Sequence, residues 1–232
     1  FFLPQINDID KLTSKYWYSK FDRGLNACEN VQFCRDIKKE LQERYYILPS
    51  ISNEIVKAVC YVYDRKKNHK NDFDKEYCSY LYYWLGDKIY NNIVNKSLFS
   101  QIIRMIYDEL NYNNIESIPI CNHVNSSIDP YYFNINKLLF DYSKDYENIR
   151  IDTASGNTTC DRVYKDYLAE YIRIYIDAYL TCKQGDHKKY DCDKFSSILN
   201  SELYNELSTF NCRERQNVVQ TPERPTQPEY KE

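Results

Sequence analysis

The cysteines are the residues whose chemistry follows most directly from type and spacing. The 232-residue chain contains nine of them, and none belongs to a Cys-x-x-Cys pair. Structural zinc sites use paired ligands separated by about two to four residues, so this spacing disfavours a metal site. Disulfide bonds formed in an oxidising compartment explain the cysteines better. The odd count leaves one thiol free, or bonded to a partner outside this sequence.

The histidines and acidic pairs form no recognisable catalytic arrangement. His69, His123 and His187 lie in polar segments without the local signature of a nucleophile and its base. Cys121 and His123 have the residue types of half a metal site, but no second pair has a suitable spacing. The acidic pairs at positions 8/10, 72/74 and 191/193 precede helical patterns, where carboxylates cap helix ends. With only four glycines, the chain also lacks phosphate-binding and calcium loops, so we expect no enzyme activity, cofactor or metal.

The segment at residues 77–90 has the strongest helical pattern in the chain. Apolar side chains recur at positions 78, 81, 85 and 89, which places them in one line along a helix. Tyr80 and Trp84 flank that line, so neighbouring helices can contact it from two sides. We therefore expect the central helix of an all-α fold here; a peripheral tyrosine-rich helix is the alternative.

Seven further segments have helical patterns, with polar connections between them. The first helix carries Tyr16 and Trp17 among its apolar residues, and the last begins at Asp191 or Asp193. The patterns extend over about residues 8–22, 29–45, 52–64, 100–110, 130–146, 160–182 and 193–212. Together they predict a disulfide-stabilised irregular multi-helix bundle over residues 1–212. Residues 213–232 have the composition of a polar, proline-containing linker or tail.

The charge and hydropathy of the chain exclude two classes of partner. Its formal net charge is −3 with both signs interspersed, which disfavours binding to nucleic acid through a positive field. No run of about eighteen apolar residues is present, so the given stretch does not span a membrane. Because it begins without methionine and ends in a polar segment, we take it as an excised fragment.

Helix geometry predicts two disulfide bonds in the C-terminal part. Cys160 and Cys182 lie at opposite ends of one helical pattern, and Cys192 and Cys212 at opposite ends of the next. Antiparallel packing of these helices places Cys182 beside Cys192 at the turn and Cys160 beside Cys212 at the far end. We therefore predict both of these bonds.

The other five cysteines are paired by the same argument. Cys60 lies near the end of the third helix and Cys78 begins the central one, so we predict a bond between them. Cys28 and Cys34 then close a small loop, and Cys121 remains as the free thiol. A bond between Cys28 and Cys121 is the alternative.

Three connections are the candidate partner-binding sites, since the helix faces are committed to the core. They cover residues 65–74, 115–127 and 148–159. The first is basic and suits a sulfated glycan or an acidic partner, although a solvated connection between helices has the same composition. The candidate binding residues are Arg65, Lys66, Lys67, His69 and Lys70 in the first connection and His123 in the second.

The pattern Cys-x-x-Leu-x-x-Trp-Leu-x-Asp-Lys at residues 78–88 resembles the Vir members of the malaria-parasite PIR superfamily. Leu3-Pro4, the positions of Cys160 and Cys182, the AT-biased composition and the polar tail are similar to that family too. The resemblance covers about residues 1–212. It implies the helical ectodomain of a variant surface antigen that is exported toward the infected red-cell surface. A transmembrane segment outside this fragment would anchor it.

The same resemblance implies a binding role without catalysis or a cofactor. The expected partners are a host cell-surface or immune receptor and antibodies, and the expected role is host-protein binding and immune evasion. Two other interpretations stay open. One is an antigenic decoy or structural protein without a specific receptor, and the other is an intracellular helical scaffold.

Overall fold

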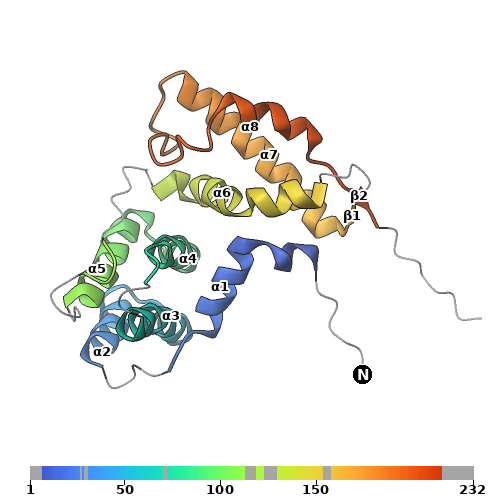
Figure 1. Ribbon diagram of the computed structural model, residues 1–232. Coiled ribbons are helices and arrows are strands. Elements are labelled where there is room, and N and C mark those ends of the chain that lie inside the picture. The colour runs from blue at the N-terminus through green and yellow to red at the C-terminus, as the bar shows by residue number, and fades with distance from the viewer. Residues whose placement is uncertain are drawn as a thin grey trace, which may run out of the picture.

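Helices form most of the described structure, which confirms the all-α prediction (Figure 1). The computed structural model describes residues 7–26, 28, 31–69, 73–112, 119–122, 130–153 and 158–215. The helices are α1 (Thr13–Arg23), α2 (Gln32–Lys39), α3 (Pro49–Asn68), α4 (Glu76–Asn92), α5 (Phe99–Tyr112), α6 (Phe133–Thr153), α7 (Arg162–Lys183) and α8 (Ser201–Glu206). A parallel pair of two-residue strands joins β1 (Thr159–Cys160) to β2 (Arg213–Glu214).

The central helix predicted at residues 77–90 is α4, which packs against α1, α3, α5 and α6 (Figure 1). Every residue from Tyr80 to Gly86 is buried, so the helix is covered on all sides at this level. Gly86 makes the contact with α6 possible, because a Cβ atom there would lie 2.1 Å from the ring of Phe133. The absence of a side chain thus lets an aromatic ring pack directly on the α4 backbone.

The C-terminal part of the described structure consists of α6, α7 and α8, which lie above α1 and α4 in the view of Figure 1. α6 contacts α1, α4 and α7, and a short 3-10 helix at Asp8–Lys11 contacts α7. Residues near both ends of the described chain meet beside the strand pair. The Asp8 N–H donates to the Asp161 carboxylate (2.6 Å), and the Arg215 guanidinium forms an ion pair with the Asp8 carboxylate. Ordered structure therefore extends on both sides of the boundary predicted at residue 212.

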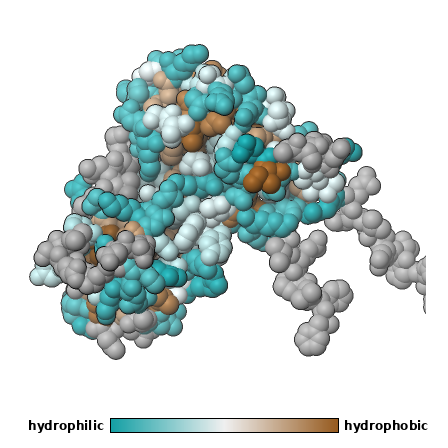
Figure 2. Space-filling view, viewed as in Figure 1, coloured by the Kyte–Doolittle hydropathy of each residue, from teal (hydrophilic) through white to brown (hydrophobic). Residues whose placement is uncertain are grey.

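The apolar side chains are mostly enclosed by these contacts. Figure 2 shows that hydrophilic residues cover most of the viewed face, with smaller, separate apolar areas. Within the described ranges, no helix combines the length and the apolar character that crossing a membrane requires.

Two segments differ from the secondary structure predicted for them. The last helix does not begin at Asp191 or Asp193, because residues 192–200 form turns and bends and only Ser201–Glu206 is α-helical. Tertiary hydrogen bonds hold the segment in this conformation: the Asp191 N–H donates to Asn136 Oδ1 (3.1 Å), and the Tyr175 hydroxyl donates to the Ile198 carbonyl (2.6 Å). Residues 148–153, predicted as part of a loop, are instead the C-terminal turns of α6.

The two disulfide bonds predicted in the C-terminal part are present. Cys160 is bonded to Cys212 and Cys182 to Cys192, with Cα separations of 5.9 Å and 5.6 Å. The first bond lies at the strand pair and the second at the turn after α7. Both therefore join segments that the antiparallel return of the chain brings together.

The disulfide bonds predicted in the N-terminal part are wrong. Cys28 is bonded to Cys60 and Cys78 to Cys121, so neither the Cys60–Cys78 bond nor the Cys28–Cys34 bond forms. The alternative Cys28–Cys121 bond is wrong for the same reason. The free cysteine is Cys34, which is buried, and not Cys121.

Backbone hydrogen bonds explain these pairings. The Leu25 N–H donates to the Lys57 carbonyl (3.0 Å), so the chain that follows α1 crosses α3 just before Cys60. At the end of α5, the Asn111 side chain accepts the Ile120 N–H (3.0 Å) and donates to the carbonyl of Cys121 (2.7 Å). These contacts position the segment containing Cys121 for its bond to the first turn of α4, and neither contact was visible as a local pattern.

Candidate functional site

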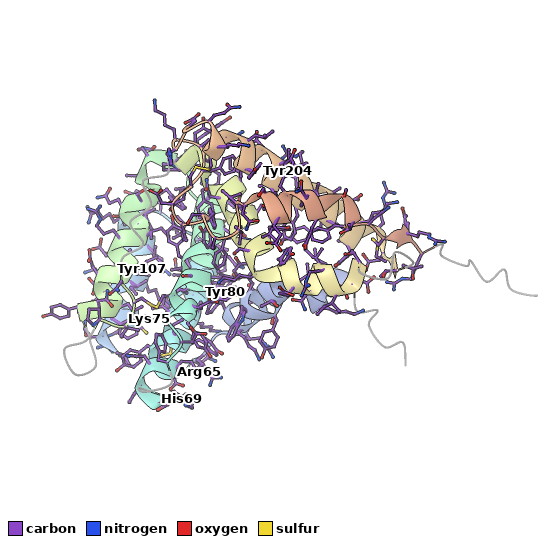
Figure 3. All side chains as sticks on the ribbon, turned by 45° about the horizontal axis from the view of Figure 1, so that its top comes forward. Arg65, His69, Lys75, Tyr80, Tyr107 and Tyr204 are labelled. Carbon is purple, nitrogen blue, oxygen red and sulfur yellow. A yellow bond between two sulfur atoms is a disulfide. The ribbon has the colours of Figure 1, made fainter. Side chains whose placement is uncertain are left out.

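The candidate binding residues of the first connection lie at the C-terminal end of α3. Arg65, Lys66 and Lys67 belong to its last turn and His69 is its C-cap, so the first four residues of the predicted loop are helical. Figure 3 shows Arg65, His69 and Lys75 at the same end of the molecule, on the side opposite Tyr204. Lys70 and His123 lie outside the described residues.

Aromatic and basic side chains from three helices gather at this end. Phe73, just before α4, stacks on Tyr77 with 5.6 Å between ring centroids, and Tyr77 packs edge-on against Trp17 of α1 at 4.8 Å. Tyr61 of α3 lies beneath, with its ring 6.2 Å from that of Tyr77. The group, which we call the aromatic–basic patch, consists of Tyr16, Trp17, Lys20, Tyr61, Arg65, Lys66, Phe73 and Tyr77.

Each basic group of the patch lies over an aromatic ring. The Lys66 ammonium is 5.1 Å from the centroid of Phe73, the Arg65 guanidinium 5.3 Å from Tyr61, and the Lys20 ammonium 4.5 Å from Tyr16. Cation–π contacts of this kind hold long side chains in place without neutralising their charge. The patch therefore presents ordered cations beside flat apolar rings.

Three described carboxylates close to patch residues in sequence have partners outside the patch. Asp64 accepts a hydrogen bond from Asn68 (2.9 Å), Asp74 caps the start of α4 by accepting the Glu76 N–H (2.8 Å), and Glu76 itself pairs with Lys144 (2.5 Å). Within the described ranges, none of the three basic groups forms an ion pair with a carboxylate. Their charge is available to an external acidic group.

A small cavity of about 180 Å³ opens inside the patch between Arg65, His69, Phe73 and Tyr77. Burial raises the pKa of the Tyr77 hydroxyl, while the hydrogen bond with Tyr61 raises the pKa of Arg65, so the phenol stays neutral and the guanidinium stays charged. The cavity combines a cation with ring faces. This combination suits a small acidic or planar group, such as one side chain of a partner protein.

Of the second predicted connection, the structure describes only residues 119–122, and these lie close to the patch. Its described residues 119–122 are fixed to α4 by the Cys78–Cys121 bond, and Cys78 directly follows Tyr77. Of the third connection, residues 148–153 are the last turns of α6 and residue 159 begins β1, away from the end that carries Arg65 and His69 (Figures 1 and 3). The structure thus brings described parts of two of the three predicted connections to the N-terminal end of α4.

Sequence reasoning missed the contribution of α1 to this surface. It assigned Tyr16 and Trp17 to the apolar residues of the first helix, but Tyr16 is 51% exposed and Trp17 is only partly buried. Consecutive residues on a helix point about 100° apart, so two adjacent aromatic rings are both buried only where neighbours cover the helix on several sides. This is the case for Tyr82, Tyr83 and Trp84 of α4, and the local sequence does not distinguish the two situations.

The chain was compared with known families, curated proteins and solved structures. A family model described as Plasmodium vivax Vir protein matches residues 12–232. No curated protein matches, and no solved structure matches.

Proposed function

The chain belongs to the Plasmodium Vir family, and on this basis we propose that it binds a host protein through the aromatic–basic patch. Membership of the family indicates a variant surface antigen, and four disulfide bonds fit an extracellular domain. We propose further that the role is adhesion and immune evasion, that a membrane anchor lies outside this sequence, and that no catalysis is involved.

The observation that carries the proposal is the combination of one exposed ring, three partly exposed rings and cations that form no ion pair among the described residues. Aromatic and arginine side chains are the residues most often responsible for binding energy at protein interfaces, because they bury a large area with few rotatable bonds. Here cation–π contacts and the packing of three helices already order them. A preordered surface loses little conformational entropy on binding, which favours affinity for a partner with an acidic segment.

A receptor-library screen with the wild-type chain tests whether a specific host partner exists. A binder found in the screen is then measured against Tyr16→Ser and Lys66→Glu, which remove one ring and reverse one charge of the patch. We expect each variant to weaken binding by about tenfold or more. Tyr112→Ser and Lys39→Glu are matched controls, since both residues are exposed and lie outside the patch.

The possible results separate the parts of the proposal. If the patch variants bind as the wild type does, the partner contacts another surface and the site assignment is wrong. If the screen finds no host protein, the receptor proposal fails and the antigenic decoy without a specific receptor becomes the better explanation.

A further inference from the structure

A second cavity, independent of the patch, lies between α2, α3 and the chain that follows α1. Its volume is about 430 Å³, within the range of about 300–1,000 Å³ that small-molecule sites occupy. The inner wall is apolar: it consists of Leu25, Val56 and the Cys28–Cys60 disulfide, with the Cys34 side chain beside them. We call this cavity the α2–α3 pocket.

The walls of this pocket are fixed before any ligand arrives. Gly24 adopts a φ of +53°, and a Cβ there would lie 2.5 Å from the Lys57 Cβ, so the chain crosses α3 at the closest possible distance. The Leu25 N–H then donates to the Lys57 carbonyl (3.0 Å), and the Cys28–Cys60 bond ties the same segment to α3 a turn further on. A hydrogen bond and a covalent bond thus hold both ends of this wall, which lowers the ordering cost of binding.

Basic side chains surround the opening. Arg35 and Lys38 of α2 and Lys57 of α3 line the pocket, and no carboxylate is among its described lining residues. Lys38 and Lys57 form no ion pair in the part of the chain that the structure describes. Burial raises the pKa of the Cys34 thiol to about 12, so the thiol is neutral and adds no negative charge.

We propose that the α2–α3 pocket binds a single-chain amphiphile with an anionic head group. The head group lies beside Lys38 and Lys57, whose ammonium groups form no ion pair in the described part of the chain and attract an anion. The apolar chain lies on Leu25, Val56 and the disulfide, which remove its methylene groups from water. The ligand needs both parts. A free inorganic anion does not cover the apolar wall, and an uncharged alcohol does not interact with the ammonium groups of Lys38 and Lys57.

Isothermal titration calorimetry with the intact chain tests this proposal, using decanoate and decyl phosphate as probes. We expect saturable binding of one molecule per chain for at least one of them, and the stronger of the two identifies carboxylate or phosphate as the preferred head group. Decanol and inorganic phosphate are the probes that lack one half of the ligand. Both are expected to bind about tenfold more weakly or not at all.

Substitutions then locate the bound probe. Lys38→Met and Lys57→Met remove one charge each while keeping an unbranched side chain, and each is expected to weaken binding by about tenfold. Lys39→Met is the matched control, because Lys39 is exposed on the same helix and does not line the pocket. Val56→Phe fills the apolar wall and is expected to reduce binding without changing the charge.

Several results would overturn the proposal. Absence of saturable binding to both anionic probes excludes it, as does an equal loss of affinity in Lys39→Met. Equal affinity for decanol shows that the cations play no part. Thermal unfolding of every variant verifies that the fold is intact, and the Lys39→Met and Lys38→Met pair remains informative even if Val56→Phe fails to fold. None of these outcomes depends on the proposed host receptor.

Discussion

The two sides of α6 contact their neighbouring helices through different kinds of side chain. Toward α4, the contact is made of rings: Phe133 packs on Gly86, and Phe140 stacks on Tyr83 with centroids 4.3 Å apart. Toward α1 and α7, the contact includes two buried carboxylates, Asp141 and Asp145, neither of which is exposed to solvent, beside the Tyr142 ring, which packs on Tyr171 and Tyr175. One helix therefore joins the N-terminal helices through an apolar seam and a polar one.

The polar side of α6 supplies hydrogen-bond acceptors that the N-terminus of α1 lacks. The N-cap of α1 is Leu12, which has no side-chain acceptor, so the first N–H groups of this helix lack a local partner. Asp145 supplies the acceptor from α6: Oδ1 accepts the Ser14 N–H (2.7 Å) and Oδ2 accepts the hydroxyls of Ser14 (2.7 Å) and Tyr171 (2.8 Å). A carboxylate at a helix N-terminus also interacts favourably with the helix dipole.

Asp141 has a comparable set of donors one turn earlier on α6. Its Oδ1 accepts the Tyr18 hydroxyl, and its Oδ2 accepts the Lys137 ammonium (2.7 Å) and the Tyr167 hydroxyl (3.3 Å). The stability of the apolar contact therefore depends on the fit of the rings. The stability of the polar contact depends on the number of hydrogen-bond donors and on the protonation of its carboxylates. Four experiments distinguish these two dependences.

We expect the largest effect from Asp141→Ala on the polar side. The substitution leaves the Lys137 ammonium and two tyrosine hydroxyls without their buried acceptor, which reduces the free energy of unfolding by about 3–5 kcal/mol. Chemical denaturation followed by circular dichroism measures this loss. Glu147→Ala on the same helix is the control, since Glu147 forms only an exposed pair with Arg150 and is expected to contribute less than about 1 kcal/mol. Similar losses in both variants would show that the polar seam contributes no special stability.

Gly86→Ala tests the apolar side and should have the second largest effect. The new methyl group overlaps the Phe133 ring, and overpacking of this kind costs about 1–3 kcal/mol even after the gain in helix propensity. Gly185→Ala is the control for backbone strain alone, because Gly185 has a φ of +80° and no atom within 4 Å of its Cβ position. If Gly86→Ala is neutral or stabilising, the ring contact is looser than the structure shows.

Of the two sides of α6, the polar side is expected to contribute a pH dependence of stability, through Asp145. Burial raises the pKa of Asp145 to about 6, although hydrogen bonds from Ser14 and Tyr171 partly oppose this shift. The folded state therefore holds the Asp145 proton more tightly than the unfolded state, whose carboxyl has a pKa near 3.8. This group contributes most stability below about pH 4, and the contribution is lost as the pH rises through about 6, by at most about 1.4 kcal/mol per pH unit.

Asp145→Asn isolates that contribution, because the amide resembles the protonated carboxyl and does not titrate. Denaturation curves for the wild type and the variant between pH 4 and pH 7 give the difference in unfolding free energy. We expect this difference to change in favour of the variant as the pH rises. Parallel curves would mean that Asp145 titrates normally in the folded protein.

The smallest effect is expected from a matched pair of tyrosine-to-phenylalanine changes. Tyr18→Phe removes a hydroxyl that donates to Asp141 and should cost about 1 kcal/mol. Tyr80 makes ring contacts with Trp17, Tyr18 and Phe140 and no side-chain hydrogen bond within the described residues, so Tyr80→Phe should be nearly neutral. Thermal unfolding resolves the two. A larger loss for Tyr80→Phe would reverse the assignment of polar and apolar sides.

The helical pattern at residues 130–146 predicted most of α6 but not its polar side. Asp141 and Asp145 lie within that pattern and are fully buried. Nothing in the local sequence distinguishes these two carboxylates from the exposed Glu147. Their burial depends on donors from α1, more than a hundred residues earlier in the chain, and on donors from α7, 26 residues later.

The binding surface was predictable to a similar degree. Arg65, Lys66 and His69 were recognisable as an exposed basic cluster, and the structure places them in or beside the patch. The partnership of Lys66 with Phe73, and of Tyr77 with Trp17, was not visible, because it depends on how α1 crosses α4.

The sequence by itself determined the all-α class, the central helix and the two C-terminal disulfide bonds, because each depends on periodicity or on the return of the chain between neighbouring segments. Only the tertiary structure decided the Cys28–Cys60 and Cys78–Cys121 bonds, the buried Cys34 thiol and the two carboxylates under α1. These features connect segments far apart in the sequence, and local patterns do not predict which segments contact each other. Their positions depend on helix packing, whose energy comes from side chains distant in sequence.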